Sequence, residues 1–184
     1  MCIPFQAVAA DSLNDIKKAA EQGEMVAQYF LGMMYEDGRG VKKDLSEAVK
    51  WYRKAAEQGY APGQYLTGEM YRKGEGVIKD SYEAANWYRK AAEQGYADAQ
   101  LNLGNMYLQT EDLSEAVKWY KKADEQGLAP AQYNLGLMYY KGKGVQLDKI
   151  KAYTLWLKAA RQGHEGAQHN LDIFCKECIS GKPV

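Results

Sequence analysis

Apolar residues recur along this chain at the spacing of one helix face. Ala27, Leu31, Met34 and Tyr35 lie at i, i+4, i+7 and i+8, which places them on the same side of a helix. The stretch 48–56 shows the same spacing after an intervening segment rich in glycine and charged residues. The pattern therefore predicts two antiparallel helices joined by a turn.

This helix pair is repeated along the chain. Four related nine-residue segments occupy 27–35, 63–71, 99–107 and 131–139. A second motif, Ala-Ala-Glu-Gln-Gly and its variants, recurs at spacings of 36, 36, 32 and 36 residues. Its final glycines are Gly23, Gly59, Gly95, Gly127 and Gly163. A fixed period of this length predicts an all-α helical solenoid, in which each unit buries its apolar face against its neighbours.

We expect one repeat domain over residues 1–184, with ten helices. An amino-terminal half repeat is followed by four full repeats and by a capping helix with a tail. The expected boundaries are 11–23, then 24–59, 60–95, 96–127 and 128–163, and finally 164–184. The third repeat lacks four residues near Tyr107–Asp112. Both helices should survive, because a change of length in a turn costs little.

Local signals mark the ends of the second helices. Asp44 followed by Glu47 has the spacing of a capping box, in which each side chain binds the other residue's backbone N–H. Asp80 with Glu83 and Asp112 with Glu115 repeat this spacing, whereas Asp148 is followed by Lys151. Gly59 is expected to end its helix in the left-handed conformation.

Glycine also recurs inside the first helix of each pair, where it costs about 1 kcal/mol relative to alanine. These glycines are Gly32, Gly68, Gly104 and Gly136, and the second helices carry Ala48, Ala84, Ala116 and Ala152 at the facing positions. We expect these small residues to let the two backbones approach closely. Aromatic pairs such as Trp51 and Tyr52 should fill the core between repeats.

Composition narrows the function classes. Lys+Arg and Asp+Glu both number 24, so the formal charge is zero, which argues against nucleic acid or an anionic membrane as the main partner. No segment approaches the roughly 18 apolar residues that a membrane span needs. The cysteines are Cys2, Cys175 and Cys178, so none lies within a repeat and no disulfide framework can hold the repeats together.

The amino terminus allows two interpretations. Residues 1–10 end in an Ala-x-Ala pattern that resembles a signal-peptidase site, but they lack a charged region and a long apolar region. They are either an alanine-rich helix start or the remnant of an export signal. Cleavage after Ala9 or Ala10 would leave Asp11 or Ser12 as a helix N-cap. We favour export to the periplasm or the medium, with a cytoplasmic location as the alternative.

The repeated motif carries a family resemblance. Ala-x-Ala-Gln-x-x-Leu-Gly-x-x-Tyr-x-x-Gly-x-Gly-Val, followed by Ala-x-x-Trp-Tyr-x-Lys-Ala-Ala-x-Gln-Gly, resembles the Sel-1-like repeat family, a relative of the tetratricopeptide repeat. The match covers about residues 11 to 178 and departs mainly in the short third loop. The resemblance implies a right-handed superhelix and a non-catalytic adaptor or scaffold that binds proteins, often in bacterial envelopes. It also implies host-interaction, signalling or type VI immunity roles. Some exported members carry a disulfide in each repeat, unlike this chain.

The resemblance also indicates where a partner would bind, because the first helices of such arrays line the concave face. Residues there that differ between repeats are free to serve recognition. The candidate residues are Tyr29, Phe30, Met33, Tyr65, Glu69, Arg72, Leu101, Asn102, Asn105, Leu108, Tyr133, Asn134, Leu137, Tyr140 and His169, with Glu36, Asn170 and Ile173 on the same face. Some of the rings could instead be partly buried between helices. Asn105 and Asn134 resemble the amides of a tetratricopeptide carboxylate clamp, but the clamp's cations are missing, so no clamp is expected.

Other chemistry is not expected. The Gly-x-Gly segments lack the Lys-Ser/Thr and the strand of a phosphate loop, and we read them as turns. His169 and Cys175 are six residues apart on one helix, about 240° around its axis, so they cannot share a zinc ion with Cys178. Neither histidine has a serine or an aspartate at a sequence spacing that would indicate a catalytic nucleophile and base. We therefore expect neither a metal nor a cofactor.

The leading hypothesis is a monomeric, non-catalytic module that binds another protein or a peptide in its concave groove. A type VI effector-immunity protein is the most specific form of this hypothesis. The alternatives are an envelope or secreted adaptor and, from a different class, a hydrolase acting on peptides or cell wall.

Overall fold

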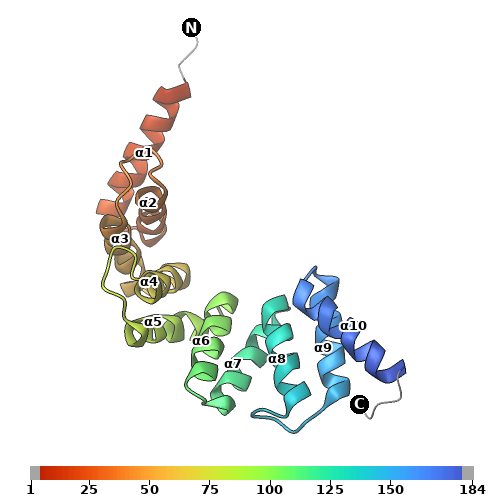
Figure 1. The fold of residues 1–184 in the computed structure, drawn as a ribbon. Coiled ribbons are helices and arrows are strands. Elements are labelled where there is room, and N and C mark those ends of the chain that lie inside the picture. Colours follow the sequence, from red (N-terminus) through yellow and green to blue (C-terminus); the bar gives the residue numbers. More distant parts are fainter. Residues whose placement is uncertain (1–4, 180–184) are drawn as a thin grey trace. The chain divides into compact units, whose positions relative to one another are not determined.

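The computed structural model describes the backbone of residues 5–179 and the side chains of residues 13–176 (Figure 1). Over this range the chain forms ten α-helices and no β-strand, as the repeat pattern predicts. The chain divides into two compact units, Met1–Tyr96 and Ala97–Val184. Within each unit, every helix packs against the next helix along the chain. The contacts are therefore local in sequence, as expected of an all-α repeat fold.

The first unit contains five helices. They are α1 (Phe5–Glu21), α2 (Met25–Asp37), α3 (Leu45–Glu57), α4 (Ala61–Lys73) and α5 (Ser81–Glu93). The second unit contains the other five. They are α6 (Ala97–Gln109), α7 (Leu113–Glu125), α8 (Ala129–Lys141), α9 (Lys149–Arg161) and α10 (Glu165–Ile179).

The amino-terminal half repeat is longer than expected. Helix α1 begins at Phe5, upstream of residue 11, and Asp11 and Ser12 lie inside it in the uncleaved chain. Their role as an N-cap is expected only after cleavage and stays a prediction. Residues 1–4 of the suspected signal remnant lie outside the described residues. The apolar spacing that predicts this helix continues upstream through an alanine-rich segment, and alanine is the best helix former.

At Asp44 and Asp80 only half of the predicted capping box forms. Asp44 accepts a hydrogen bond from the Glu47 N–H at 3.1 Å, and equivalent bonds fix the starts of α5, α7 and α9. The reciprocal bond is replaced, because the Asp44 N–H donates to the Tyr35 carbonyl at 2.9 Å. Asp80 and Asp148 make the same bond to Tyr71 and Tyr139, so the three N-caps that follow a long turn are tied to the end of the preceding helix.

The shortened third turn leaves both of its helices intact, as expected. Helices α6 and α7 each have 13 residues, the same length as their counterparts. The turn closes with Glu111 at φ 60°, a left-handed conformation that costs a non-glycine residue about 1 kcal/mol. Loss of the Gly-x-Gly segment therefore changes the connection and not the helices.

An aromatic ring fits into a glycine notch in every full repeat. A Cβ atom added to Gly68 would lie 2.8 Å from the ring of Tyr88, and at Gly104 the nearest ring atom of Tyr120 would be 2.7 Å away. Tyr52 and Trp156 fill the same place against Gly32 and Gly136. The glycine thus makes room mainly for a ring, and the expected approach of small residues is secondary, with the Ala84 carbonyl at 3.2 Å from the added Cβ at Gly68.

A relay of glutamine side chains joins successive helices. Gln64 is buried. Its amide N–H donates to the Ala56 carbonyl of α3 at 3.1 Å, and its oxygen accepts from Gln94, the residue that follows α5, at 2.7 Å. Gln28 makes the same two bonds with Ala20 and Gln58. In the second unit Gln126 donates to Gln100, and Gln162 donates to Gln132. The relay explains the glutamine that recurs in both repeated motifs, a role that the sequence patterns did not reveal.

The ring-in-notch packing predicts that Gly68→Ala destabilises the fold. Alanine gains about 1 kcal/mol of helix propensity, but the clash with a fully buried ring costs about 1–3 kcal/mol. We expect a net loss of up to about 2 kcal/mol in the free energy of unfolding, measured by urea denaturation.

The double variant Gly68→Ala/Tyr88→Ala is the control. With the ring removed, the alanine at position 68 should become neutral or stabilising relative to Tyr88→Ala alone. An equal penalty in both backgrounds would contradict the notch as the reason for the glycine.

Candidate functional site

The expected groove residues are exposed to very different degrees. Phe30, Arg72, Leu108 and His169 are exposed, and Glu69 is buried. The others are half-buried: Tyr29, Met33, Tyr65, Leu101, Asn102, Asn105, Tyr133, Asn134, Leu137 and Tyr140. The contacts of each side chain therefore decide whether it packs within the fold or can meet a partner.

Three of the predicted tyrosines pack between repeats. The ring of Tyr29 lies 5.4 Å from that of Tyr60, and Tyr65 lies 5.1 Å from Tyr96. Tyr133 stacks on His164 at 4.5 Å. In each case the partner is the residue that precedes the next first helix. These rings are thus part of the contact between repeats, the alternative that the sequence left open.

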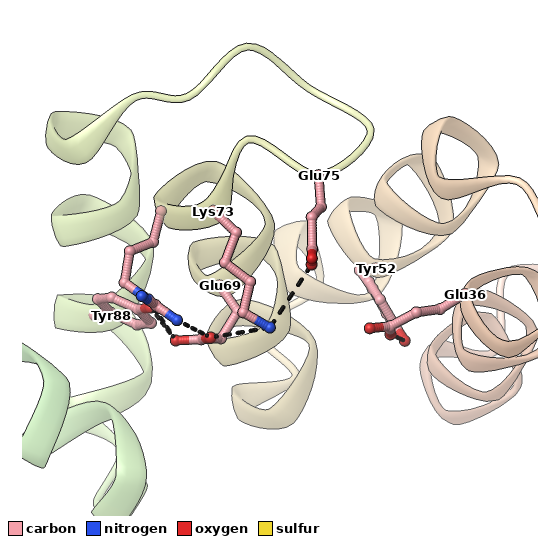
Figure 2. A network of polar contacts seen from close by, with 7 residues as sticks. Glu36, Tyr52, Glu69, Lys73, Glu75 and Tyr88 are labelled. Carbon is pink, nitrogen blue, oxygen red and sulfur yellow. Dashed lines mark hydrogen bonds and ion pairs between the residues drawn. The ribbon is translucent and has the colours of Figure 1, made fainter.

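The prediction that Glu69 faces a partner is wrong. Its side chain is buried at the centre of an ion-pair and hydrogen-bond network (Figure 2). The hydroxyl of the buried Tyr88 donates to its carboxylate. Arg72 approaches both carboxylate oxygens, at 3.0 and 2.7 Å. Lys73 lies 3.5 Å from Glu69 and 3.6 Å from Glu75. The two predicted contacts Glu69 and Arg72 are thereby bound to each other.

The ring hydroxyls in the notches find an acceptor on the first helix in other repeats as well. Tyr52 donates to Glu36, also shown in Figure 2. Tyr120 donates to Asn105 at 2.7 Å, and Asn134 donates to the same oxygen at 3.1 Å. Asn105, predicted as a partner contact, therefore holds the core ring in place.

Burial and hydrogen bonding shift the pKa values of these groups. Burial opposes ionisation of Glu69, but hydrogen bonds from Arg72 and Tyr88, together with the positive charges of Arg72 and Lys73, outweigh it, so the pKa of Glu69 lies below its ordinary value. Burial and the adjacent Glu69 raise the pKa of Tyr88. Burial raises the pKa of Tyr120 to about 12. All three groups stay in the form that supports the hydrogen bonds.

Two adjoining hollows occur in the second unit. One, of about 220 Å³, is lined by Leu137, Tyr140, Lys141, Trp156, Asn170, Ile173 and Phe174. The other, of about 230 Å³, is lined by Leu108, Asn134, Leu137, Met138, Lys141 and Lys143. They share Leu137 and Lys141. The structure thus brings together four predicted residues, Leu108, Asn134, Leu137 and Tyr140, with apolar side chains exposed at Leu108 and Ile173.

The sequence prediction missed Lys141, Lys143 and Phe174 in these hollows. Lys141 and Lys143 follow the predicted face at the end of α8, and only the folded turn places Lys143 at the wall. A comparison of charges between repeats could have pointed to the lysines, because the corresponding turn of the second repeat carries Glu75. His169, by contrast, is exposed and does not line either hollow.

The hollows contain side chains suited to contact and not an assembled metal site. No group of three or more His, Cys, Asp or Glu side chains in the described residues could hold a metal ion. Cys175 is a free, exposed thiol, and the side chain of Cys178 lies outside the described residues. No helix within the described range is long and apolar enough to cross a membrane.

The lowered pKa of Glu69 predicts a pH-dependent effect of Glu69→Gln. A depressed carboxyl pKa adds stability above the unfolded value of about 4.3, and this stability is lost as the pH falls through the folded value. We expect the variant to lose about 1–2 kcal/mol of unfolding free energy at pH 7. The difference from the parent should shrink at pH 3, as measured by urea denaturation at both pH values.

Glu75→Gln provides the matched control. Glu75 reaches only Lys73, in an exposed ion pair, so its replacement should cost about 0.5 kcal/mol or less at either pH. A Glu69→Gln penalty that is the same at pH 3 and pH 7 would show that the charge of Glu69 does not stabilise the fold.

Comparisons with known proteins agree with this architecture. A c5321 protective antigen of uropathogenic Escherichia coli, described as having an SLR fold, is 43% identical over 84% of the chain with a TM-score of 0.82, although the chain spans only 34% of that protein. A Sel1 repeat protein of Oxalobacter formigenes is 35% identical, covering 88% of this chain and 74% of that one, with a TM-score of 0.79.

A third solved structure is the immunity protein Pa5087 of Pseudomonas aeruginosa. It is 29% identical over 84% of this chain and 59% of its own, with a TM-score of 0.55. No curated protein matches the chain closely enough to be paired with it. The Sel1 repeat profile matches four successive segments, residues 26–60, 61–96, 97–128 and 129–164. The chain belongs to the Sel1 repeat family.

Proposed function

We propose that this chain is a non-catalytic module that binds a partner protein on the face formed by its first helices. Sel1 repeat proteins bind other proteins, which gives the general class. The observation that carries the proposal is the pair of adjoining hollows on α6, α8 and α10. Their walls combine exposed aliphatic side chains with a few amides and lysines, a mixture that suits protein recognition.

The division between packing and recognition supports this assignment. Tyr29, Tyr65 and Tyr133 contact the next repeat, and Glu69 and Asn105 hold core tyrosines. Phe30 and His169 are exposed but line neither hollow. The candidates that gather at one place are those that line the hollows, chiefly Leu108, Leu137, Tyr140, Asn170 and Ile173. The proposed surface is narrower than the groove expected from the sequence.

The shifted ionisable groups also favour a binding role over hydrolysis. A catalytic carboxylate or base needs access to substrate, with its pKa tuned toward the working pH. Glu69 is instead buried with its pKa lowered, and Tyr52, Tyr88 and Tyr120, whose pKa values are raised, fill notches in the core. These shifts serve the fold.

Within this class, we favour an effector-immunity role. The support is the similarity to the immunity protein Pa5087, at 29% identity. Such a protein would block one toxic enzyme by tight one-to-one binding, and export to the periplasm, suggested by the Ala-x-Ala pattern, would place it where an envelope-directed toxin acts.

Replacing the exposed aliphatic side chains of the hollows should weaken partner binding. Leu108→Ser plus Ile173→Ser removes apolar contact area where both side chains reach solvent, so the fold should be retained. We expect at least a tenfold loss of captured partner, because losing two buried aliphatic contacts costs about 2 kcal/mol or more. Affinity capture followed by mass spectrometry, with circular dichroism of each variant, measures this loss.

Leu147→Ser plus Ile150→Ser is the matched control, since both residues are exposed in the same unit but line neither hollow. The control should capture the partner as the parent does. Equal capture by the hollow variant, or a loss confined to the control, would move the binding surface elsewhere.

The immunity role makes a separate prediction. Cells that express the parent chain should survive a toxin encoded beside its gene, whereas cells that express the Leu108→Ser/Ile173→Ser variant should not. Survival is measured by plating after toxin induction. Failure of the parent chain to bind or protect against that toxin would remove the immunity role and leave the general binding role standing.

A further inference from the structure

The ends of α4 and α8 occupy the same place in two repeats but carry different charges, because the two acids near the end of α4 have no counterpart near the end of α8. Gly68 and Gly136, and then Gly74 and Gly142, set the register. In this register Glu69 corresponds to Leu137, Arg72 to Tyr140, Lys73 to Lys141, and Glu75 to Lys143. A lysine is kept at one position, and the two acids are replaced by a leucine and a second lysine.

In the second repeat the cations are neutralised within the chain. Arg72 and Lys73 share the Glu69 carboxylate, and Lys73 also reaches Glu75. Figure 2 shows Lys73 between these two acids. This end of α4 therefore offers little net charge to a partner.

In the fourth repeat the same positions leave two cations uncompensated. Lys141 and Lys143 are exposed, and neither has an ion-pair partner within the described part of the chain. No Asp or Glu occurs between Glu125 and Asp148. Both lysines line the 230 Å³ hollow beside Leu108 and Leu137, so apolar and cationic groups meet at one place.

We propose that this hollow binds an acidic segment of a partner protein. An aliphatic or aromatic side chain of the segment enters between Leu108 and Leu137, and an adjacent Asp or Glu carboxylate lies against Lys141 and Lys143. The inference rests on the proposed function, which it makes more specific by stating the chemistry of the ligand. Charge complementarity selects the partner and speeds association, and the apolar contact retains it.

The charge distribution favours an acidic protein segment over nucleic acid. Two lysines beside an aliphatic hollow provide few phosphate contacts, and the formal charge of the whole chain is zero. Nucleic-acid binding sites instead spread many cations along the backbone of their ligand. The two leucines and the amide of Asn134 that line the same hollow as the lysines fit a mixed acidic and apolar peptide.

The test selects a random peptide library on the intact chain and on Lys141→Glu/Lys143→Glu. The parent should enrich peptides that place Asp or Glu next to Leu, Ile, Phe or Met. The selected peptides are then synthesised with a fluorophore, and their affinity is measured by anisotropy. Charge reversal should weaken binding about tenfold, since each exposed pair contributes up to about 1 kcal/mol, and the parent's affinity should fall as salt rises.

Lys42→Glu/Lys43→Glu is the control, because it makes the same charge change on two exposed lysines of the first unit. It should select and bind the same peptides as the parent. Selection of no peptides, of peptides without acidic residues, or of the same peptides by the Lys141→Glu/Lys143→Glu variant would overturn the inference. Loss of binding when the peptide carries a C-terminal amide would assign the site to a terminal carboxylate, and tighter binding of an oligonucleotide would assign it to nucleic acid.

The two proposals can fail separately. If Leu108→Ser/Ile173→Ser loses the natural partner while Lys141→Glu/Lys143→Glu keeps it, the two hollows form the binding surface but the bound segment is not acidic. If neither variant loses the partner, the hollow is not the binding surface.

Discussion

The repeat depends on one contact, a large ring seated against a helix that has no side chain at that point. Tyr88 shows what the contact requires: the ring is fully buried, its edge fits only because residue 68 is glycine, and its hydroxyl still needs an acceptor. Burying that hydroxyl without one would cost about 1–3 kcal/mol. Each first helix must therefore supply a glycine at the contact and a hydrogen-bond acceptor for the ring's polar group.

The acceptor accounts for much of the variation between repeats. Glu69, Glu36 and Asn105 each accept a hydrogen bond from a tyrosine hydroxyl. Glu69 and Asn105 directly follow the notch glycine, whereas Glu36 lies one turn further along its helix. In the fourth repeat the ring is Trp156, whose N–H donates to the Tyr133 carbonyl at 3.2 Å. No side-chain acceptor is then needed, and Leu137 can occupy the position of Glu69. The change of ring thus releases a position on the surface of α8.

The helices, their caps and the repeat register could be predicted from sequence because each depends on local spacing. The roles of Glu69, Asn105 and Tyr133 could not, because they depend on which side chain of another helix reaches them. A polar residue that differs between repeats is easily taken for a partner contact, because the sequence does not show that it accepts a hydrogen bond from a core tyrosine. The hollows likewise combine side chains of α6, α8, α9 and α10, and their lysines lie just beyond the helix face that the apolar periodicity marks.

The glutamine relay has a consequence for how such arrays change in length. Gln28 and Gln64 each donate to the helix before them and accept from the helix after them. Removing one whole period would bring Gln64 to the Ala20 carbonyl and keep the hydrogen bonds of the remaining relay glutamines. Removing half a period would strand buried donors and acceptors. Gain or loss of complete repeats is therefore the change of chain length that leaves no buried glutamine of the relay without its hydrogen bonds.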